Sequence, residues 1–201
     1  MKKSTLARLF ALLLCLLLAL AGCSSDGEDG TDPAPDQQEE QQNNDQQDNQ
    51  EDNQQEDNSD QPQGETFTYD HMTIVVPEGF TVDESGSFPI LYPPTYPDET
   101  DNINITMAGA DNIDNYTQDV LESYYSSAIS GFGGITDFEK TTVDGVDALR
   151  CSYQVTTSGV TMTGTQYYVF GEDYTDIITF TSVTGAYDTA FEQCAASITM
   201  D

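Results

Sequence analysis

Cys23 is the residue of this chain whose chemistry is indicated most directly by its neighbours. It follows Leu20, Ala21 and Gly22, at the point where an apolar run gives way to a polar one. A cysteine thiol is the nucleophile required to take up a lipid through a thioether bond. This arrangement predicts that Cys23 is lipidated and becomes the first residue of the mature protein.

The residues before Cys23 have the organisation of an export signal. Lys2, Lys3 and Arg8 precede twelve apolar residues, Leu9 to Leu20. A membrane-spanning helix needs about twenty apolar residues, so this run is too short to cross a bilayer. The pattern resembles the lipobox of bacterial lipoproteins, which implies a lipid anchor on the extracytoplasmic face of the cell membrane. The alternative is an ordinary secretory signal that leaves Cys23 as a free thiol.

Two other cysteines, Cys151 and Cys194, form the only internal pair that can remain after the signal is removed. Export permits a disulfide. Cys151 lies in a predicted strand and Cys194 in a predicted terminal helix. We expect a bond if that helix packs on the face of the sheet to which Cys151 points. The alternative is two buried thiols that serve as packing.

The remaining sequence carries weak signals for catalysis. His71, the single histidine, stands beside a predicted turn, and no Gly-x-Ser-x-Gly or Cys/His signature accompanies it. A structural or exposed turn histidine is the favoured interpretation. Gly131, Gly133 and Gly134 follow a predicted helix, whereas phosphate-binding loops precede one. We therefore expect no catalytic residues, no cofactor and no enzyme activity.

Three acidic groups and a set of tyrosines offer binding chemistry. Calcium prefers carboxylate oxygens, but none of the acidic groups has the spacing of a calcium loop, so we favour solvated turns and leave calcium open. One histidine and two distant thiols make zinc less favoured still. The tyrosines allow a sugar-binding platform, although core packing is the more usual role. The acidic groups are Asp98, Glu99 and Asp101; Asp111 and Asp114; and Glu172, Asp173 and Asp176; the tyrosines are Tyr124, Tyr125, Tyr153, Tyr167, Tyr168 and Tyr174.

The charge of the chain restricts its partners. It has 5 Lys and Arg against 36 Asp and Glu, and only Lys140 and Arg150 follow the signal. Nucleic acids and anionic headgroups are bound through cations, so neither is an expected partner of the mature chain. We expect a bilayer reached through lipidated Cys23, and an envelope protein with a surface rich in Lys or Arg.

The chain divides into a signal peptide (1–22), a tether (23–64) and a globular domain (65–201). Residues 24–64 contain fourteen Asp or Glu and no Lys, Arg or aromatic residue. This stretch has too little apolar surface to form a core, and we predict a disordered Gln/Asn/Asp/Glu-rich tether. The domain is rich in Val, Ile, Thr, Tyr and Phe, with turn residues at intervals typical of antiparallel sheets.

The expected elements give an α+β domain of two helices and seven or eight strands. The first helix has a possible capping box, Asn115 with Gln118, and Gly131 after its end. The second has an apolar face between Tyr187 and Ile198. The expected strands are 67–69, 73–76, 88–92 and 102–108, followed by a meander of 135–143, 146–157, 160–170 and 174–183, with tight turns at Asp144–Gly145 and Ser158–Gly159.

The order of these pieces resembles the PsbP-like domains, which include bacterial lipoproteins of the LpqN type. The matching pieces are Ile74–Val76 followed by Pro77–Phe80, the helix after Asn115, the hairpin with Gly145, and the ending 191–198. The resemblance implies an antiparallel sheet flanked by two helices, a PsbP-like α/β/α sandwich. It also implies binding or assembly roles without shared catalytic residues. We therefore expect a membrane-anchored lipoprotein with a non-catalytic protein-binding or envelope-assembly domain; the alternatives are a solute- or glycan-binding lipoprotein and an envelope hydrolase.

Overall fold

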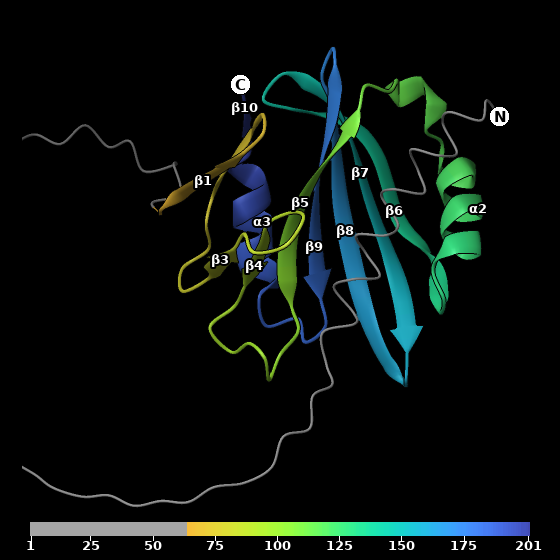
Figure 1. The fold of residues 1–201 in the computed structure, drawn as a ribbon. Coiled ribbons are helices and arrows are strands. Elements are labelled where there is room, and N and C mark those ends of the chain that lie inside the picture. The colour runs from red at the N-terminus through yellow and green to blue at the C-terminus, as the bar shows by residue number, and fades with distance from the viewer. Residues whose placement is uncertain (1–63) are drawn as a thin grey trace, which may run out of the picture.

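The computed structural model describes residues 64–201, which form two antiparallel sheets and two α-helices (Figure 1). The expected signal peptide, Cys23 and residues 23–63 of the tether lie outside the described residues. The seven strands of the larger sheet are, in spatial order, β3 (Thr81–Asp83), β4 (Ile90–Tyr92), β5 (Asn102–Gly109), β9 (Tyr174–Ser182), β8 (Val160–Phe170), β7 (Val146–Thr157) and β6 (Phe132–Val143). The smaller sheet has the order β1 (Thr66–Tyr69), β2 (Met72–Val75), β10 (Thr199–Met200).

The α+β class is confirmed, with ten strands among the described residues rather than seven or eight. The difference comes mainly from β3 and β10, which have 3 and 2 residues and are too short to show an alternating pattern. The meander β6–β7–β8–β9 is present as predicted. Its turns are local in origin: Asp144 and Gly145 have φ of 49° and 79°, and Ser158 and Gly159 have φ of 51° and 83°. Positive φ at both central residues is the signature of a type I′ hairpin.

Two helices cover opposite faces of the larger sheet (Figure 1). Helix α2 (Gln118–Ala128) follows a short 3₁₀ turn, η1 (Ile113–Asn115), and helix α3 (Asp188–Ala196) precedes β10. The N-cap of α2 is Thr117, whose hydroxyl accepts a hydrogen bond from the backbone of Val120, so the expected cap at Asn115 was wrong. Because residues 113–115 form the 3₁₀ turn η1, helix α2 is capped two residues later than expected, at Thr117.

Alternation along each strand divides the core into two layers. On β7, Leu149, Cys151 and Tyr153 belong to the cluster beneath α2. Ala148, on the other face of the same strand, belongs to the cluster beneath α3, together with Cys194 of that helix. The small sheet lies on the α3 side, where Met72 and Ile74 of β2 are fully buried. The sheet is therefore enclosed by α2 on one face and by α3 with β1–β2–β10 on the other.

None of the helices formed by residues 64–201 is sufficiently long and apolar to span a bilayer.

Candidate functional site

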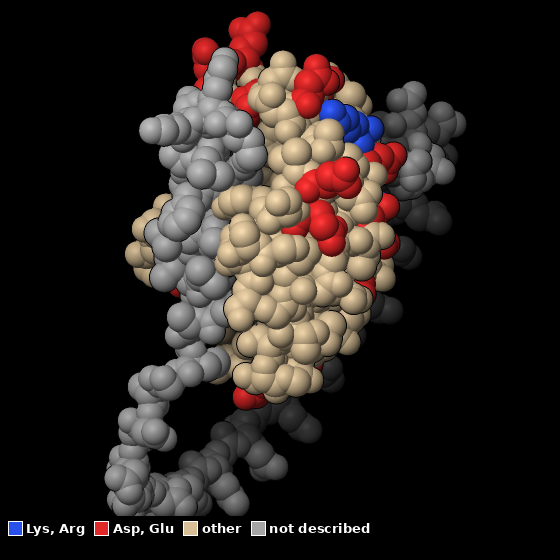
Figure 2. Space-filling view, turned by 90° about the vertical axis from the view of Figure 1, so that its right-hand side faces the viewer, with Lys and Arg blue, Asp and Glu red and all other residues tan. Residues whose placement is uncertain are grey.

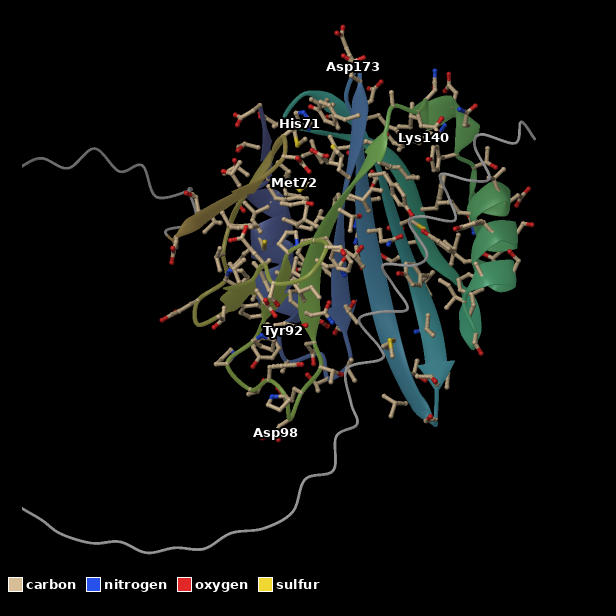
Figure 3. The ribbon with its side chains drawn as sticks, in the orientation of Figure 1. His71, Met72, Tyr92, Asp98, Lys140 and Asp173 are labelled. Carbon is tan, nitrogen blue, oxygen red and sulfur yellow. The ribbon has the colours of Figure 1, made fainter. Side chains whose placement is uncertain are left out.

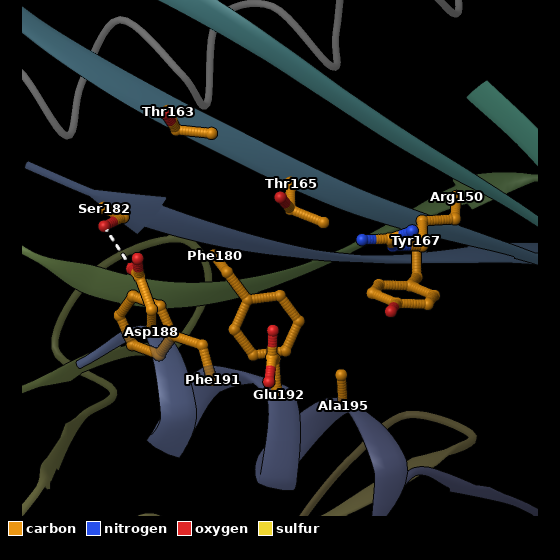
Figure 4. A pocket seen from close by; sticks show the side chains of 10 residues that line it. All are labelled: Arg150, Thr163, Thr165, Tyr167, Phe180, Ser182, Asp188, Phe191, Glu192 and Ala195. Atoms are coloured by element: carbon orange, nitrogen blue, oxygen red, sulfur yellow. Dashed lines mark hydrogen bonds between the residues drawn. The ribbon is translucent and has the colours of Figure 1, made fainter. Parts of the chain in front are cut away.

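A hollow runs between α3 and strands β6, β7 and β8. Two cavities of about 200 and 440 Å³ that share four lining residues form it, and we call it the α3 groove. Figure 4 shows the smaller of the two cavities. Arg150, Tyr167, Glu192 and Ala195 line both cavities, so they mark the middle of the groove. The further lining residues are Thr163, Thr165, Phe180, Ser182, Asp188 and Phe191 at one end and Glu139, Thr141, Thr142, Val143, Asp144, Ala196 and Ile198 at the other.

The two walls of the groove differ in origin. Strands β7 and β8 present every second residue to the α3 side, which places Arg150 beside Tyr167 through their register. Helix α3 contributes Glu192 and Ala195, three residues apart and therefore neighbours on one helix face. Phe180 and Phe191 pack against each other with ring centroids 5.5 Å apart, which gives the groove an apolar base at one end.

The electrostatic character of the groove is acidic. Its lining contains four carboxylates, at Glu139, Asp144, Asp188 and Glu192, against one base, Arg150. The guanidinium of Arg150 already donates to Asp137, which lies outside the lining, at 2.8 Å. The cation is thus neutralised locally, and the remaining carboxylates favour a positively charged or neutral polar occupant.

The pKa of the Tyr167 hydroxyl reflects the burial and the charges of the groove. Burial raises the pKa of its hydroxyl, the positive charge and hydrogen bond of Arg150 lower it, and the negative charges of Glu139 and Glu192 raise it. Tyr167 therefore stays protonated at neutral pH and can both donate and accept a hydrogen bond. Neither this groove nor the role of Arg150 was predicted from the sequence, because β7 and α3 are brought together only by the fold.

A second grouping lies at the turn between β1 and β2. His71 stacks on Tyr174 with ring centroids 3.7 Å apart and planes 5° from parallel. Its Nδ1 lies 3.4 Å from Oδ2 of Asp176, a side chain that is 1% exposed. Figure 3 shows His71 at the same end of the molecule as Asp173, in the turn that precedes β9. The sequence signal for this site was Asp176 itself, a charged residue within a strand whose middle is buried on both faces.

The expected disulfide between Cys151 and Cys194 was wrong. Both cysteines are free and buried. Cys151 points towards α2 and Cys194 lies in the cluster on the opposite face, so the sheet separates them. The prediction required the terminal helix to pack on the face of Cys151, and α3 packs on the other. Burial raises the pKa of each thiol to about 12, so both are inert packing groups.

The other candidate residues are dispersed by the fold. Of the acidic groups, Asp101 is buried and accepts bonds from the backbones of Val183 and Thr184, which ties β5 to the segment after β9. Residues 64–201 contain no cluster of three or more His, Cys, Asp or Glu side chains placed to hold a metal ion. The six tyrosines do not form one platform: Tyr125, Tyr153 and Tyr168 lie in the core beneath α2, Tyr124 packs against that core, Tyr167 lines the groove, and Tyr174 stacks on His71.

The charged side chains on the face that carries α2 are mostly acidic. Figure 2 shows many more Asp and Glu than Lys or Arg side chains on the face that carries α2.

The expected helix exit is present at Gly131, which has φ of 80° and whose absent Cβ would lie 2.0 Å from the carbonyl oxygen of Thr156. Only glycine fits there.

No family model matches this chain, and no curated protein sequence matches it significantly. Among solved structures, it is similar to cyanobacterial PsbP (CyanoP) from Synechocystis sp. PCC 6803, with a TM-score of 0.53 and 12% identity over 68% of this chain and 92% of that one. It is also similar to LpqN of Mycobacterium tuberculosis, described as involved in cell envelope biogenesis, with a TM-score of 0.45 and 14% identity over 64% of this chain and 82% of that one.

A Bacteroides thetaiotaomicron structure matches with a TM-score of 0.48 and 15% identity over 70% of this chain, which spans about half (49%) of that protein. The likeness to CyanoP, with a TM-score above 0.5, concerns the fold. The domain therefore has a PsbP-like fold, as the order of its sequence elements predicted.

Proposed function

We propose that this protein is a lipid-anchored, extracytoplasmic binding protein whose domain docks a basic segment of another envelope protein in the α3 groove. The observation that carries the proposal is the charge of that groove, where four carboxylates face a single arginine that is already paired. Glu139 and Glu192 are exposed and have no ion-pair partner among the described residues. Lysine or arginine side chains of a partner would complement them.

The shape and chemistry of the groove favour an extended polypeptide. Thr141, Thr163 and Thr165 supply hydroxyls that can donate or accept along the strand wall, while Phe180 supplies an apolar contact. The N-terminal segment of the chain is a poor occupant, because residues 24–64 carry fourteen acidic and no basic residues. Like charges would repel it from the groove, which stays available to a partner.

The anchor is proposed on the sequence alone. Lipidation of Cys23 would confine the domain to the membrane surface, where a long acidic tether raises its effective concentration near other envelope proteins. Replacing Cys23 with Ser should release the protein from membranes or block its processing, and mass spectrometry of the native protein should show a diacylglyceryl adduct. Unchanged membrane attachment of the Cys23→Ser variant contradicts the anchor.

The groove is tested by photo-crosslinking in intact cells. A photoreactive residue at Thr163 or Thr165 should capture one envelope protein, whereas the same residue at Ser123, on the exposed side of α2, should not. The double substitution Glu139→Lys with Glu192→Lys should weaken binding of that partner at least about tenfold.

The matched control for charge is Glu172→Lys with Asp173→Lys, which changes the net charge equally at an exposed turn away from the groove. This control should bind almost as the native protein does, and native binding should weaken with salt. Equal losses of binding in both double variants would mean that the net charge of the domain, and not the groove, determines binding. Capture from Ser123 instead of Thr163 would assign the interface to the α2 side.

An envelope hydrolase is the alternative that the structure allows to be tested directly. Nδ1 of His71 lies 3.4 Å from a carboxylate oxygen of Asp176, and a neighbouring carboxylate is a feature of histidine bases. Among residues 64–201, however, no serine, threonine or cysteine side chain forms a hydrogen bond with His71 that would make it a nucleophile's base. A hydrolytic activity on an envelope substrate that disappears in His71→Ala would favour the hydrolase over the binding protein.

A further inference from the structure

Asp176 of β9 is a buried carboxylate without a well-formed hydrogen bond, and its nearest donors are the N–H groups of His71. Its side chain is 1% exposed, and neither Oδ1 nor Oδ2 accepts a hydrogen bond in the described part of the chain. Nδ1 of His71 is equally buried and has no hydrogen bond. An ionised carboxylate in such a place is unfavourable unless it is paired, and unsatisfied buried groups are uncommon in folded proteins. This pair therefore requires a physical role.

The ionisable groups around the His71–Asp176 pair come from three elements, with Asp70 and His71 acting directly on Asp176 and Asp201 acting on Tyr174. Asp70 and His71 form the turn between β1 and β2, Tyr174 lies two residues earlier on β9, and Asp201 follows β10. The backbone N–H of Asp201 donates to the carbonyl of His71 at 2.9 Å.

The cross-strand partners of Asp176 do not titrate. They are Met107 on β5 and Val169 on β8. His71 is consequently the one neighbour, among the elements packed on Asp176, that can place a positive charge beside the carboxylate.

We propose that His71 and Asp176 form a proton-operated latch that holds the β1–β2 turn and β10 on the sheet at mildly acidic pH and loosens them as the pH rises. When at least one proton is shared by the pair, the buried site contains an ion pair or a neutral carboxyl group. When no proton remains, a single buried carboxylate is left beside a neutral imidazole. Opening of the turn then brings water to the carboxylate.

The direction of the effect follows from the pKa of Asp176. Burial raises it from 3.8 to about 6, the charge of His71 lowers it, the charge of Asp70 raises it, and the nearby backbone and ring N–H groups of His71 lower it further. In the opened turn the pKa returns towards 3.8, so the closed latch binds the proton more tightly than the open one. Protons therefore favour closure: the effect is complete below about pH 4 and is lost as the pH rises through about 6, with a change of up to about a hundredfold in the closing equilibrium.

Opening of the latch would affect both the first strand of the domain and the α3 groove. Strand β1 begins at Thr66, directly after the first described residues, so opening would loosen the attachment of the N-terminal segment. The backbone N–H of Met200 on β10 donates at 3.0 Å to Asp144, which lines one end of the groove. Loosening of β10 thus removes a partner from a groove carboxylate.

The test is amide hydrogen exchange of the full-length protein between pH 4 and pH 8, corrected for the intrinsic dependence of exchange on pH. Protection of the Met72 and Met200 amides should fall by up to about a hundredfold across this range. In Asp176→Asn it should not depend on pH, while Asp173→Asn, a matched change at an exposed site in the turn that precedes β9, should behave as the native protein does.

Either of two results would overturn the latch: protection in the native protein that does not change with pH, or an Asp176→Asn variant that retains the native pH dependence. If Asp176→Asn does not fold, infrared spectroscopy of the native protein decides the question. A carboxyl band that titrates near pH 6 supports the latch, and titration of every carboxyl group below pH 5 contradicts it.

Discussion

The two faces of the seven-stranded sheet bury their polar groups in different ways. Beneath α2, the hydroxyls of Tyr125 and Tyr168 both donate to Oε1 of Gln166, at 2.6 and 2.7 Å, and the amide of Gln166 donates to Thr179 at 3.0 Å. Each of these buried groups is satisfied, and the one buried hydroxyl beneath α2 without a partner, that of Tyr153, carries no charge. On the α3 face, Asp176 is just as buried, is ionisable, and makes no well-formed hydrogen bond.

This difference separates a structural face from a face with exchangeable partners. A satisfied buried network specifies one arrangement of the core. The α3 face instead combines an open groove, a paired arginine and a buried carboxylate, Asp176, whose neighbouring base is His71. We therefore expect substitutions on the α2 face to act on stability, and substitutions on the α3 face to act on binding and on the response to pH.

The largest expected effect is the loss of core packing beneath α2. Leu121 is fully buried in that cluster, so Leu121→Ala should lower the free energy of unfolding by about 3 kcal/mol through lost burial and a residual cavity. Urea denaturation measures the change. Val160→Ala, at a side chain that is 48% exposed, should stay within about 0.5 kcal/mol of the native protein. A loss below 1 kcal/mol for Leu121→Ala would mean that α2 is not an integral part of the core.

The next effect has the opposite sign. Because burial raises the pKa of Asp176 to about 6, the folded state binds a proton more tightly than the unfolded state, and stability decreases as the pH rises from about 4 to above 6. Asp176→Asn should remove this decrease and raise the free energy of unfolding at pH 8 by about 2 kcal/mol. Denaturation at pH 4.5 and pH 8 provides the comparison. Destabilisation at both pH values would show that Asp176 is satisfied by partners after all.

A smaller effect is expected for one hydroxyl of the satisfied network. Tyr168→Phe removes a hydrogen bond but leaves Tyr125 bonded to Gln166, so no buried group loses its last partner. The expected loss is about 1 kcal/mol, without a dependence on pH below 9, because burial raises the pKa of both tyrosines well above 10. The contrast with Asp176→Asn is the sharpest test of the difference between the faces. A gain in stability from Tyr168→Phe would contradict the expected difference between the two faces.

The smallest effect concerns the thiols on the two faces. Cys151 and Cys194 should not react with a thiol reagent at pH 8 in the folded protein, because burial raises the pKa of each to about 12. Unfolding without a reductant should expose two additional reactive thiols. Cys151→Ala and Cys194→Ala should each expose one. Finding no additional thiols in the unfolded native protein would support the disulfide between Cys151 and Cys194 that the sequence predicted.

Several elements were predictable because their causes lie within a few residues. The Asp144–Gly145 and Ser158–Gly159 turns require positive φ at both central positions, and their residues accept it. Strands β7 and β8 were placed to the residue, because these turns set their ends. The start of α2 was missed by two residues, since Asn115 and Thr117 are both suitable caps and η1 decides between them.

The candidate sites were less predictable because their members are far apart in the chain. His71 was identified as the single histidine, but its contact with Asp176 joins residues more than a hundred positions apart. The α3 groove likewise combines Glu139, Arg150 and Glu192 from three elements. Sequence periodicity places a residue on one face of its own element and does not specify which neighbouring element covers that face.

The sequence by itself determined the class of the domain, the meander, its turns and the acidic character of the chain, because these depend on local conformation and on composition. The pattern at residues 1–23 likewise depends on local sequence, and it supports the proposed lipid anchor. Only the tertiary structure decided that α3 lies on the face opposite Cys151, which rules out the expected disulfide and creates the groove. Strand pleating made both faces of β7 available, and the packing of the whole domain selected between them.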